Sequence, residues 1–195
     1  MVTHTRRRPW ALIACLAATF MLDRGSTQGD DASPGGLSDY RIKAAYLYYF
    51  TTFVEWAPET YTRTGEALVI GLLGEDPFGA ILDDTVRGKS FNSRKIVIRR
   101  FANLKDVRDC HVLFIGASER DRLPSILKAL EGAAVLTVGD LDRFAVRGGQ
   151  IEFRTEEKKV RFDINVAAVE KAHLKVSAQL MKLGRVVDPT GRQGG

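Results

Sequence analysis

The chain reads VIGLLGED at residues 69–76, an almost fully apolar stretch that ends in glycine and two acids. The same order of residue types recurs as VLFIGASE at residues 112–119 and as VLTVGD at residues 135–140. Short apolar strands followed by glycine turns are typical of a parallel sheet that is covered on both faces. Parallel strands bring their turns to one edge of the sheet, where open α/β folds bind ligands. The pattern therefore predicts an α/β fold and a place for a site.

Two further segments near the C-terminus, at residues 151–155 and 160–164, alternate between apolar and polar residues. Such alternation in two neighbouring runs predicts an antiparallel hairpin with one solvent-facing side. A further strand is expected over residues 95–101, and Asn165 and Ser177 are suited to cap the two helices after the hairpin. We therefore expect a single three-layer α-β-α domain with a mixed, mostly parallel sheet and a C-terminal antiparallel hairpin.

An aromatic-rich helix is predicted ahead of the first strand. Ser38 or Asp39 can cap it, and Pro58 ends it after about Trp56. The side of this helix that does not cover the sheet is expected to face a second molecule, since aromatic residues are enriched at interfaces. The residues with helical spacing that are expected to cover the sheet are Ile42, Ala45, Tyr46, Tyr49, Phe50, Phe53 and Trp56. The partner-interface candidates on the remaining side are Tyr40, Ala44, Tyr48 and Thr51.

The N-terminus has the layout of a secretory signal peptide: three arginines at residues 6–8, an apolar run over residues 10–22 and a polar exit. The run is short for a membrane-spanning helix. An uncleaved membrane anchor and a wrongly assigned start codon are the alternatives. We predict four parts: a signal peptide at 1–24 with an undefined cleavage site, a disordered linker at 25–37, the folded domain at 38–187 and a flexible tail at 188–195.

The net charge of +5 says little about the folded domain. Residues 1–24 contribute +3 through four arginines and one aspartate, which leaves +2 for the rest of the chain. A nearly balanced, exported domain gives no electrostatic reason to expect nucleic acid as a partner.

Cys110 is the only cysteine outside the predicted signal peptide, so an intramolecular disulfide is not expected even in an oxidising compartment. It opens an apolar strand, which predicts a buried small side chain, and a reactive or intermolecular thiol is the alternative. Its neighbour His111 would point to the opposite face of a strand, so we predict no metal site there or elsewhere. The chain lacks a P-loop and the glycine fingerprint of dinucleotide binding, so no cofactor is predicted.

Ser118, in the sequence GASER, comes close to a nucleophile elbow, the sharp turn that exposes the serine of many hydrolases. The elbow needs a glycine where Arg120 stands. A downstream acid and base exist in the right order, as Asp140 or Asp163 followed by His173. Capping of the following helix is the simpler role for Ser118, and no catalytic residue is predicted.

A ligand crevice is expected where the glycine turns meet at the sheet edge. Side chains that follow these turns are the crevice candidates: Glu75, Asp76, Ser118, Glu119 and Asp140. A crevice without residues placed for general acid–base catalysis favours a binding or regulatory module over an enzyme.

The chain resembles the YfiR family over about residues 40–187, essentially the whole predicted domain. The order and spacing of several modest motifs carry the resemblance. They are YRIKAAYLYYF (40–50), FVEW (53–56), GEDPFG (74–79), CHVLFI (110–115) with SE (118–119), LTV (136–138), VRFDINVAA (160–168), LKVS (174–177) and LMKL (180–183).

The resemblance implies a small exported α/β protein of Gram-negative bacteria. The best-understood member is a periplasmic inhibitor that binds the periplasmic domain of an inner-membrane diguanylate cyclase and keeps cyclic-di-GMP output low. That member is a dimer whose disulfides influence its stability. The present chain departs there, because Cys110 has no partner outside the signal segment. The resemblance thus implies a homodimer and an inner-membrane partner, which is a diguanylate cyclase or a sensor kinase.

Three hypotheses follow. The first is a periplasmic repressor of a membrane signalling protein. The second is a periplasmic small-molecule-binding module that feeds a membrane sensor, and the two are compatible if a ligand switches the repressor. The third is a hydrolase built on Ser118.

Overall fold

A computed structural model describes residues 36–188 of the chain. The predicted signal peptide, nearly all of the predicted linker and the tail from residue 189 lie outside this range. Within residues 36–188, no helix is long and apolar enough to cross a membrane.

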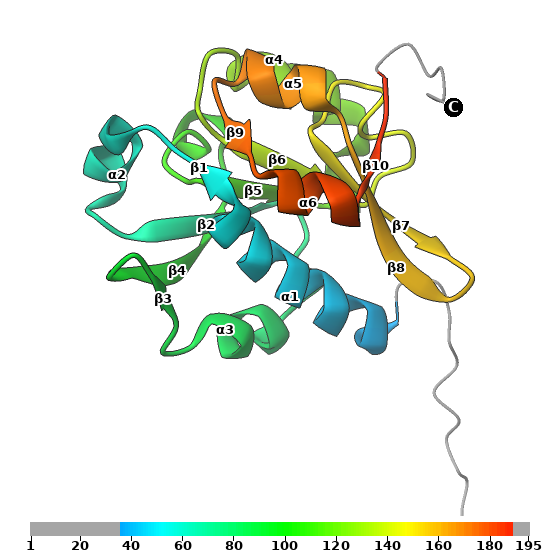
Figure 1. Ribbon diagram of the computed structural model, residues 1–195, viewed down its shortest axis with the longest axis horizontal. Helices are drawn as coiled ribbons and strands as arrows, with labels where there is room; N and C mark the ends of the chain where they lie inside the picture. The colour runs from blue at the N-terminus through cyan, green and yellow to red at the C-terminus, as the bar shows by residue number, and fades with distance from the viewer. Residues whose placement is uncertain (1–35, 189–195) are drawn as a thin grey trace, which may run out of the picture. The chain divides into compact units, whose positions relative to one another are not determined.

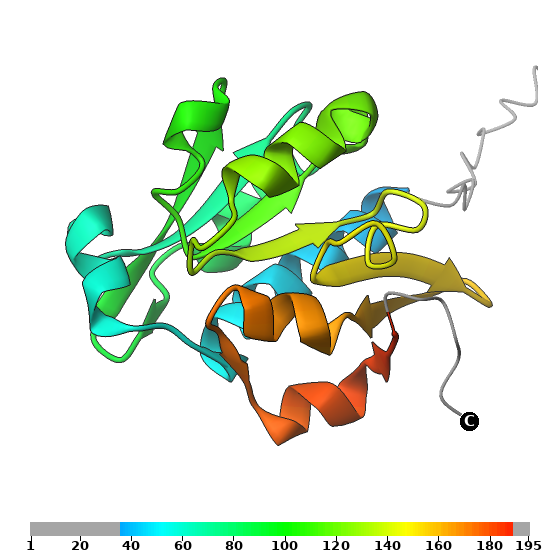
Figure 2. The ribbon, with the colours of Figure 1, turned by 90° about the horizontal axis from the view of Figure 1, so that it is seen from above.

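An eight-stranded sheet forms the centre of the domain, in the order β10-β8-β7-β6-β5-β2-β4-β3 (Figures 1 and 2). Neighbours from β7 to β4 pair in parallel, whereas β7–β8 and β3–β4 are antiparallel. A separate two-stranded sheet pairs β1 with β9. The strands are β1 Val54–Glu55, β2 Leu68–Leu73, β3 Ser90–Phe91, β4 Arg94–Phe101, β5 Val112–Ile115, β6 Leu136–Gly139, β7 Ile151–Glu156, β8 Lys159–Ile164, β9 Lys175–Val176 and β10 Arg185–Val186.

Helices cover both faces of the sheet, so the α/β fold, the mixed sheet and the C-terminal hairpin are confirmed. The helices are α1 Leu37–Phe53, α2 Pro58–Thr64, α3 Ala80–Val86, α4 Leu123–Ala129, α5 Val166–Lys171 and α6 Ala178–Leu183, with 3₁₀ turns η1 Leu104–Asp106 and η2 Ala117–Arg122. The capping predictions for α5 and α6 are also confirmed. Asn165 Oδ1 accepts from the Ala168 N–H, and Ser177 Oγ accepts from the Leu180 N–H.

Strand β2 shows why its sequence is apolar throughout, because all six of its residues are buried. Leu68 and Ile70 pack into the hydrophobic cluster that contains α1, whereas Val69 and Leu73 pack into the cluster that contains α4. A strand between two helical layers has no solvent-facing side, which removes the usual alternation. Strands β4 and β5 flank β2, so the chain reverses its winding direction here, and ligand crevices in open α/β sheets form at such switch points.

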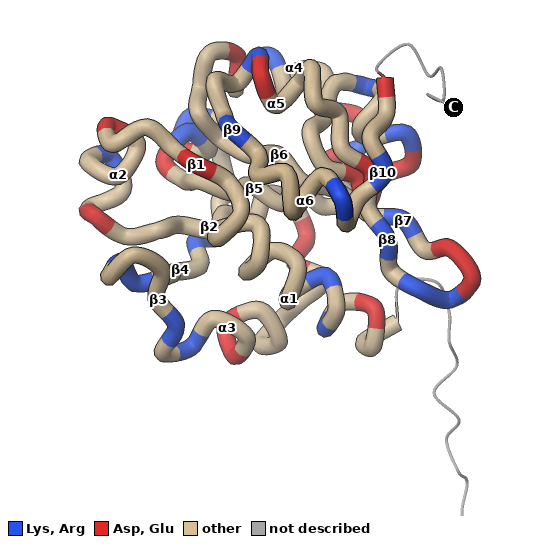
Figure 3. Tube along the Cα trace, viewed as in Figure 1, with Lys and Arg blue, Asp and Glu red and all other residues tan. Residues whose placement is uncertain are grey.

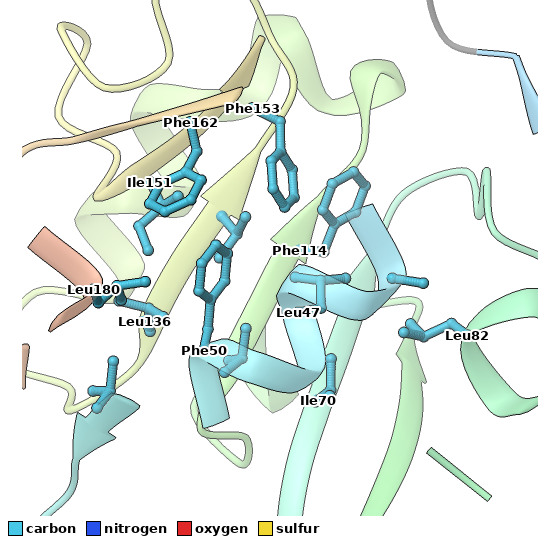
Figure 4. Close-up of a cluster of buried hydrophobic side chains, with 14 of the residues drawn as sticks. Leu47, Phe50, Ile70, Leu82, Phe114, Leu136, Ile151, Phe153, Phe162 and Leu180 are labelled. Atoms are coloured by element: carbon cyan, nitrogen blue, oxygen red, sulfur yellow. The ribbon is translucent and has the colours of Figure 1, made fainter. Parts of the chain in front are cut away.

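Helix α1 anchors the larger hydrophobic cluster. The Phe50 ring lies 5.8 Å from that of Phe153 and 5.3 Å from that of Phe162, both on the terminal hairpin, and Leu47 is buried beside it (Figure 4). Full burial of one such side chain contributes about 1.5–3 kcal/mol. The helix is therefore fixed to the sheet along its length.

The predicted orientation of α1 is wrong in part. Ala44 and Thr51, expected on the exposed side, are fully buried at 0% exposure, whereas Ile42 and Tyr49 of the predicted core stripe are 42% and 50% exposed. Helix α1 carries apolar residues on all of its sides, so the spacing of these residues alone did not identify the buried face. Small residues allow close approach to the sheet. The helix also ends at Phe53 rather than near Trp56, because the chain continues as β1.

Candidate functional site

The turns after β2 and β5 are in direct contact at the sheet edge. The Glu75 backbone N–H donates to Ser118 Oγ at 2.8 Å. Gly74 has a φ of +89°, and a Cβ at this position would lie 2.5 Å from Ser118 Oγ and 2.8 Å from Glu119 Cγ. Only glycine fits both this backbone conformation and this close approach. The two turns are therefore held together by groups of the chain itself.

The capping role predicted for Ser118 is wrong. The residue lies inside η2, and Gly116, at the N-cap position, makes no side-chain capping bond. The Ser118 hydroxyl instead accepts the hydrogen bond from Glu75, in the turn after β2 and 43 residues away in sequence. Nucleophilic catalysis needs a base within hydrogen-bond reach of the hydroxyl. The acids suggested as its relay partners bind cations, Asp140 with Lys43 and Asp163 with Arg185.

Asp140, at the end of β6, forms a buried anchor for α1. Its Oδ2 accepts from Lys43 Nζ at 2.8 Å and from the Tyr40 hydroxyl at 3.0 Å. The Lys43 and Asp140 side chains are only 6% and 11% exposed. Burial and the Asp140 carboxylate raise the pKa of Tyr40, so the hydroxyl stays a donor. The structure thus joins an interface candidate, Tyr40, to a crevice candidate, Asp140.

Asp76 organises the loop after β2. Its Oδ1 accepts from the Phe78 N–H at 2.8 Å, and its Oδ2 lies 2.8 Å from Nε of Arg100. Arg100 also pairs with Asp83 at 2.6 Å, and these contacts hold the pKa of Asp83 below its usual value. Glu119 is buried and faces Arg122 at 3.2 Å. Glu75 itself is exposed.

The five crevice candidates follow the carboxyl ends of β2, β5 and β6, which are neighbouring parallel strands. Four of them already form side-chain hydrogen bonds or ion pairs within the chain: Asp76, Ser118, Glu119 and Asp140. Among residues 36–188, no group of three or more His, Cys, Asp or Glu side chains is placed to hold a metal ion. Cys110 is fully buried as predicted, and burial raises the pKa of its thiol.

A cavity of about 360 Å³ lies away from this edge, between α4 and α5. Thr137 and Gln150 are among the residues that line it, with Lys128, Arg147 and Lys171. Thr137 and Gln150 bond each other, through Thr137 N–H to Gln150 Oε1 and Gln150 N–H to Thr137 Oγ1. No sequence pattern marks this cavity, because its residues come from four segments with no shared motif.

An apolar surface lies on α1, α6 and β10, and we call it the α1–α6 surface. Its members are the exposed large hydrophobic residues of these elements beyond the first turn of α1: Ile42, Tyr49, Met181, Leu183 and Val186. Helix α1 packs against α6 and carries no charged residue from Ala44 to Phe53 (Figure 3). The Tyr49 ring lies 5.5 Å from that of Tyr48.

The remaining interface candidates, Tyr40 and Tyr48, are half-buried. Lys89 Nζ lies 4.1 Å above the Tyr48 ring, so this ring already has a cationic neighbour. The most exposed aromatic side chain on α1 is therefore Tyr49, which sequence spacing had assigned to the core.

A family model described as YfiR/HmsC-like matches residues 40–185, well over half of the chain. The matched span contains the Asp140 anchor, the contact between the β2 and β5 turns, and nearly all of the α1–α6 surface. The match confirms the resemblance found in the sequence. No curated protein matches the chain.

Proposed function

Because the chain belongs to the YfiR/HmsC-like family, we propose that it is an exported, periplasmic regulator that binds and represses an inner-membrane signalling protein, most directly a diguanylate cyclase. Members of this family are regulators rather than enzymes, and the family is consistent with control of diguanylate cyclases. The family match is the observation that carries the proposal. The engaged state of Ser118, Asp140 and Asp163 agrees with a role that needs no acid–base chemistry.

The α1–α6 surface is the proposed contact surface. Exposed groups of large apolar side chains mark interaction sites, and aromatic residues are enriched at their centres. Tyr49 on α1 and Leu183 on α6 are 50% and 58% exposed, whereas Leu47 and Phe50 on the other side of α1 are fully buried. The Lys43–Asp140 pair fixes one end of α1 to the sheet, so a partner would meet a preformed surface.

A homodimer is proposed to use the same surface. In a two-fold dimer the same patch serves both subunits, so a residue at its centre affects both copies at once. Tyr49→Asp places a charge in the patch and should raise the dimer dissociation constant, which analytical ultracentrifugation measures.

Cyclic-di-GMP measurements in cells test the repression. Deletion of the gene should raise cyclic-di-GMP, and the wild-type chain should restore the lower level. Tyr49→Asp should fail to restore it while keeping the wild-type melting temperature. Ala167→Asp, which adds the same charge at an exposed position of α5, should restore it. Unchanged cyclic-di-GMP in the deletion strain would contradict repression of a cyclase.

The cavity between α4 and α5 supports a second candidate function, small-molecule binding that feeds a membrane sensor. Its volume of about 360 Å³ lies in the range of small-ligand sites. Lys128, Arg147 and Lys171 outnumber the single acid of the lining, Glu131, which favours an anionic molecule. A ligand at one hundred times its dissociation constant adds about 2.7 kcal/mol of stability. A thermal-shift screen of anionic metabolites should find such a compound, and Lys128→Ala should weaken its effect.

A further inference from the structure

Four buried side-chain nitrogen or oxygen atoms in the described part of the chain have no hydrogen-bond partner: Trp56 Nε1, Arg94 Nε, His111 Nε2 and Glu119 Oε2. The Glu119 atom still has a cation, Arg122, at 3.2 Å. The other three are N–H donors. Buried donors without acceptors are rare in folded proteins, so three in one region need a physical explanation.

These three donors belong to one cluster of side chains around Tyr61 of α2. The Arg94 guanidinium lies 4.2 Å from the centre of the Tyr61 ring, and the His111 ring lies 4.7 Å from it. The Trp56 ring lies 5.4 Å from the His111 ring. Arg94 begins β4 and His111 precedes β5, so the cluster lies at the amino edge of the parallel strands, opposite the edge that carries Asp140.

The structure fixes the His111 ring and its proton. Nδ1 accepts from the Val69 N–H at 3.1 Å, and the backbone of His111 bonds to Val69 and Leu136 on both sides. A neutral imidazole whose Nδ1 accepts carries its proton on Nε2. Burial and nearby arginines lower the pKa of His111 to about 4, so the ring is neutral near pH 7. Nε2–H is therefore a fixed donor.

The contact between the Trp56 and His111 rings can satisfy at most one of their two N–H donors. The Trp56 and His111 rings meet edge to face at 84°. In such a pair only one ring directs its edge at the face of the other, so at most one of these two N–H groups lies over the other ring of the pair. The other N–H needs an acceptor outside this ring pair, and residues 36–188 give it no hydrogen bond. Trp56 is 7% exposed and His111 is 0% exposed, so bulk water does not fill this role.

The surrounding charge is positive. Arg63, Arg94 and Arg99 all act on His111 electrostatically. The carboxylate paired with Arg94 is that of Glu66, at 3.1 Å, and its side chain is 66% exposed. Because the Glu66 carboxylate faces solvent, it neutralises only part of the positive field that the arginines create around His111. This field favours an anion over a water molecule as the missing acceptor.

We propose that Trp56 Nε1–H and His111 Nε2–H bind one small monovalent anion of the carboxylate or halide class at the amino edge of the sheet. The site joins α2 to β5 through the bound anion, and it is separate from the α1–α6 surface.

Titration with sodium formate tests the site in the full-length protein. Ionic strength is held constant with a bulky sulfonate salt, and the indole N–H resonances are followed by NMR. The Trp56 resonance, identified by its loss in Trp56→Phe, should shift along a saturable curve. Trp10, the other tryptophan, lies in the predicted signal peptide and serves as an internal reference in the uncleaved chain. A Trp56 resonance that stays in place, or drifts without saturation, would overturn the proposal.

Two variants assign the binding to the donors. His111→Asn keeps an acceptor for the Val69 N–H but removes Nε2–H, so the saturable shift should disappear, and its persistence would overturn the proposal. Because His111→Asn can unfold the domain, Trp56→Phe gives a second test. Formate should raise the melting temperature of the wild type but not of Trp56→Phe, and an equal rise in both would overturn it.

A charge comparison tests the role of the arginines. Arg94→Gln should raise the apparent dissociation constant for formate several-fold. Arg161→Gln, at an exposed position on β8, should leave it unchanged. Equal affinity in both variants would contradict an anion held by local positive charge.

Discussion

Nζ of Lys43 lies 2.8 Å from Oδ2 of Asp140, and both side chains are almost fully removed from solvent. This pair connects the first helix to the end of β6, 97 residues further along the chain. Desolvation of two charges is costly, so such a pair contributes more to the position of α1 than to net stability. The position of α1 in turn determines which of its aromatic residues face outward.

Lys43→Met should lower the free energy of unfolding by about 3–5 kcal/mol, because Asp140 is left buried without its cation. The double variant Lys43→Met/Asp140→Leu should recover most of that loss, since it removes both charges. Urea denaturation of the two variants measures the difference. A single variant as stable as the wild type would show that the pair is not desolvated.

Phe50→Ala and Tyr49→Ala compare neighbouring aromatic residues on the two sides of α1. Phe50 is fully buried, so its truncation should cost about 3–5 kcal/mol. Tyr49 is half-exposed, so its truncation should cost about 1 kcal/mol or less. Similar losses in thermal denaturation would contradict the observed orientation of the helix.

Gly74→Ala should destabilise the domain more than Gly132→Ala. Both glycines have positive φ, +89° and +71°, so both variants strain the backbone. Only at Gly74 would the new Cβ also collide, at 2.5 Å from Ser118 Oγ. The difference in melting temperature isolates the contact between the two turns. Equal losses would mean that the turns can move apart freely.

Stability should fall on acidification because His111 is buried in its neutral form. Its pKa is about 4 in the folded chain against an ordinary value of 6.5. Between these values the unfolded chain binds a proton that the folded chain does not. The stabilisation is therefore complete above pH 6.5 and is lost as the pH falls towards 4, by up to about 3 kcal/mol. His111→Asn should show a flatter profile in urea denaturation across this window, and an unchanged slope would contradict the assignment.

Cys110 should resist alkylation in the native protein. The thiol is fully buried and donates to the Val107 carbonyl, and burial raises its pKa. Thiolate is the reactive form, so iodoacetamide should modify Cys110 only after denaturant is added. Peptide mass spectrometry separates this residue from Cys15. Rapid native modification would indicate an accessible, reactive thiol.

Local signals predicted the sheet well. The apolar stretch that begins at Val69 was expected to form a strand, and β2 covers Leu68–Leu73, because a fully buried strand is short, apolar and ended by glycine. Asn165 and Ser177 were correctly identified as caps, because a cap bonds a backbone group three residues away. Such features depend on neighbours in sequence.

Contacts between residues far apart in the sequence could not be predicted from these local patterns. Ser118 resembled a cap, but its hydroxyl accepts from the Glu75 N–H across the sheet edge. Ala44 and Thr51 were placed on the wrong side of α1, because small residues buried against a sheet have no distinctive spacing when aromatic residues surround the helix. The Lys43–Asp140 pair likewise depends on strand order, which determines where α1 meets the sheet.

Site-specific photo-crosslinking in intact cells tests the proposed function most directly. A photoreactive amino acid at Tyr49, within the α1–α6 surface, is compared with the same group at Ala167 on α5. The group at Tyr49 should capture an inner-membrane protein with a cytoplasmic diguanylate cyclase or kinase domain, and the group at Ala167 should not. Capture of soluble cytoplasmic proteins alone, or equal capture from both positions, would contradict it.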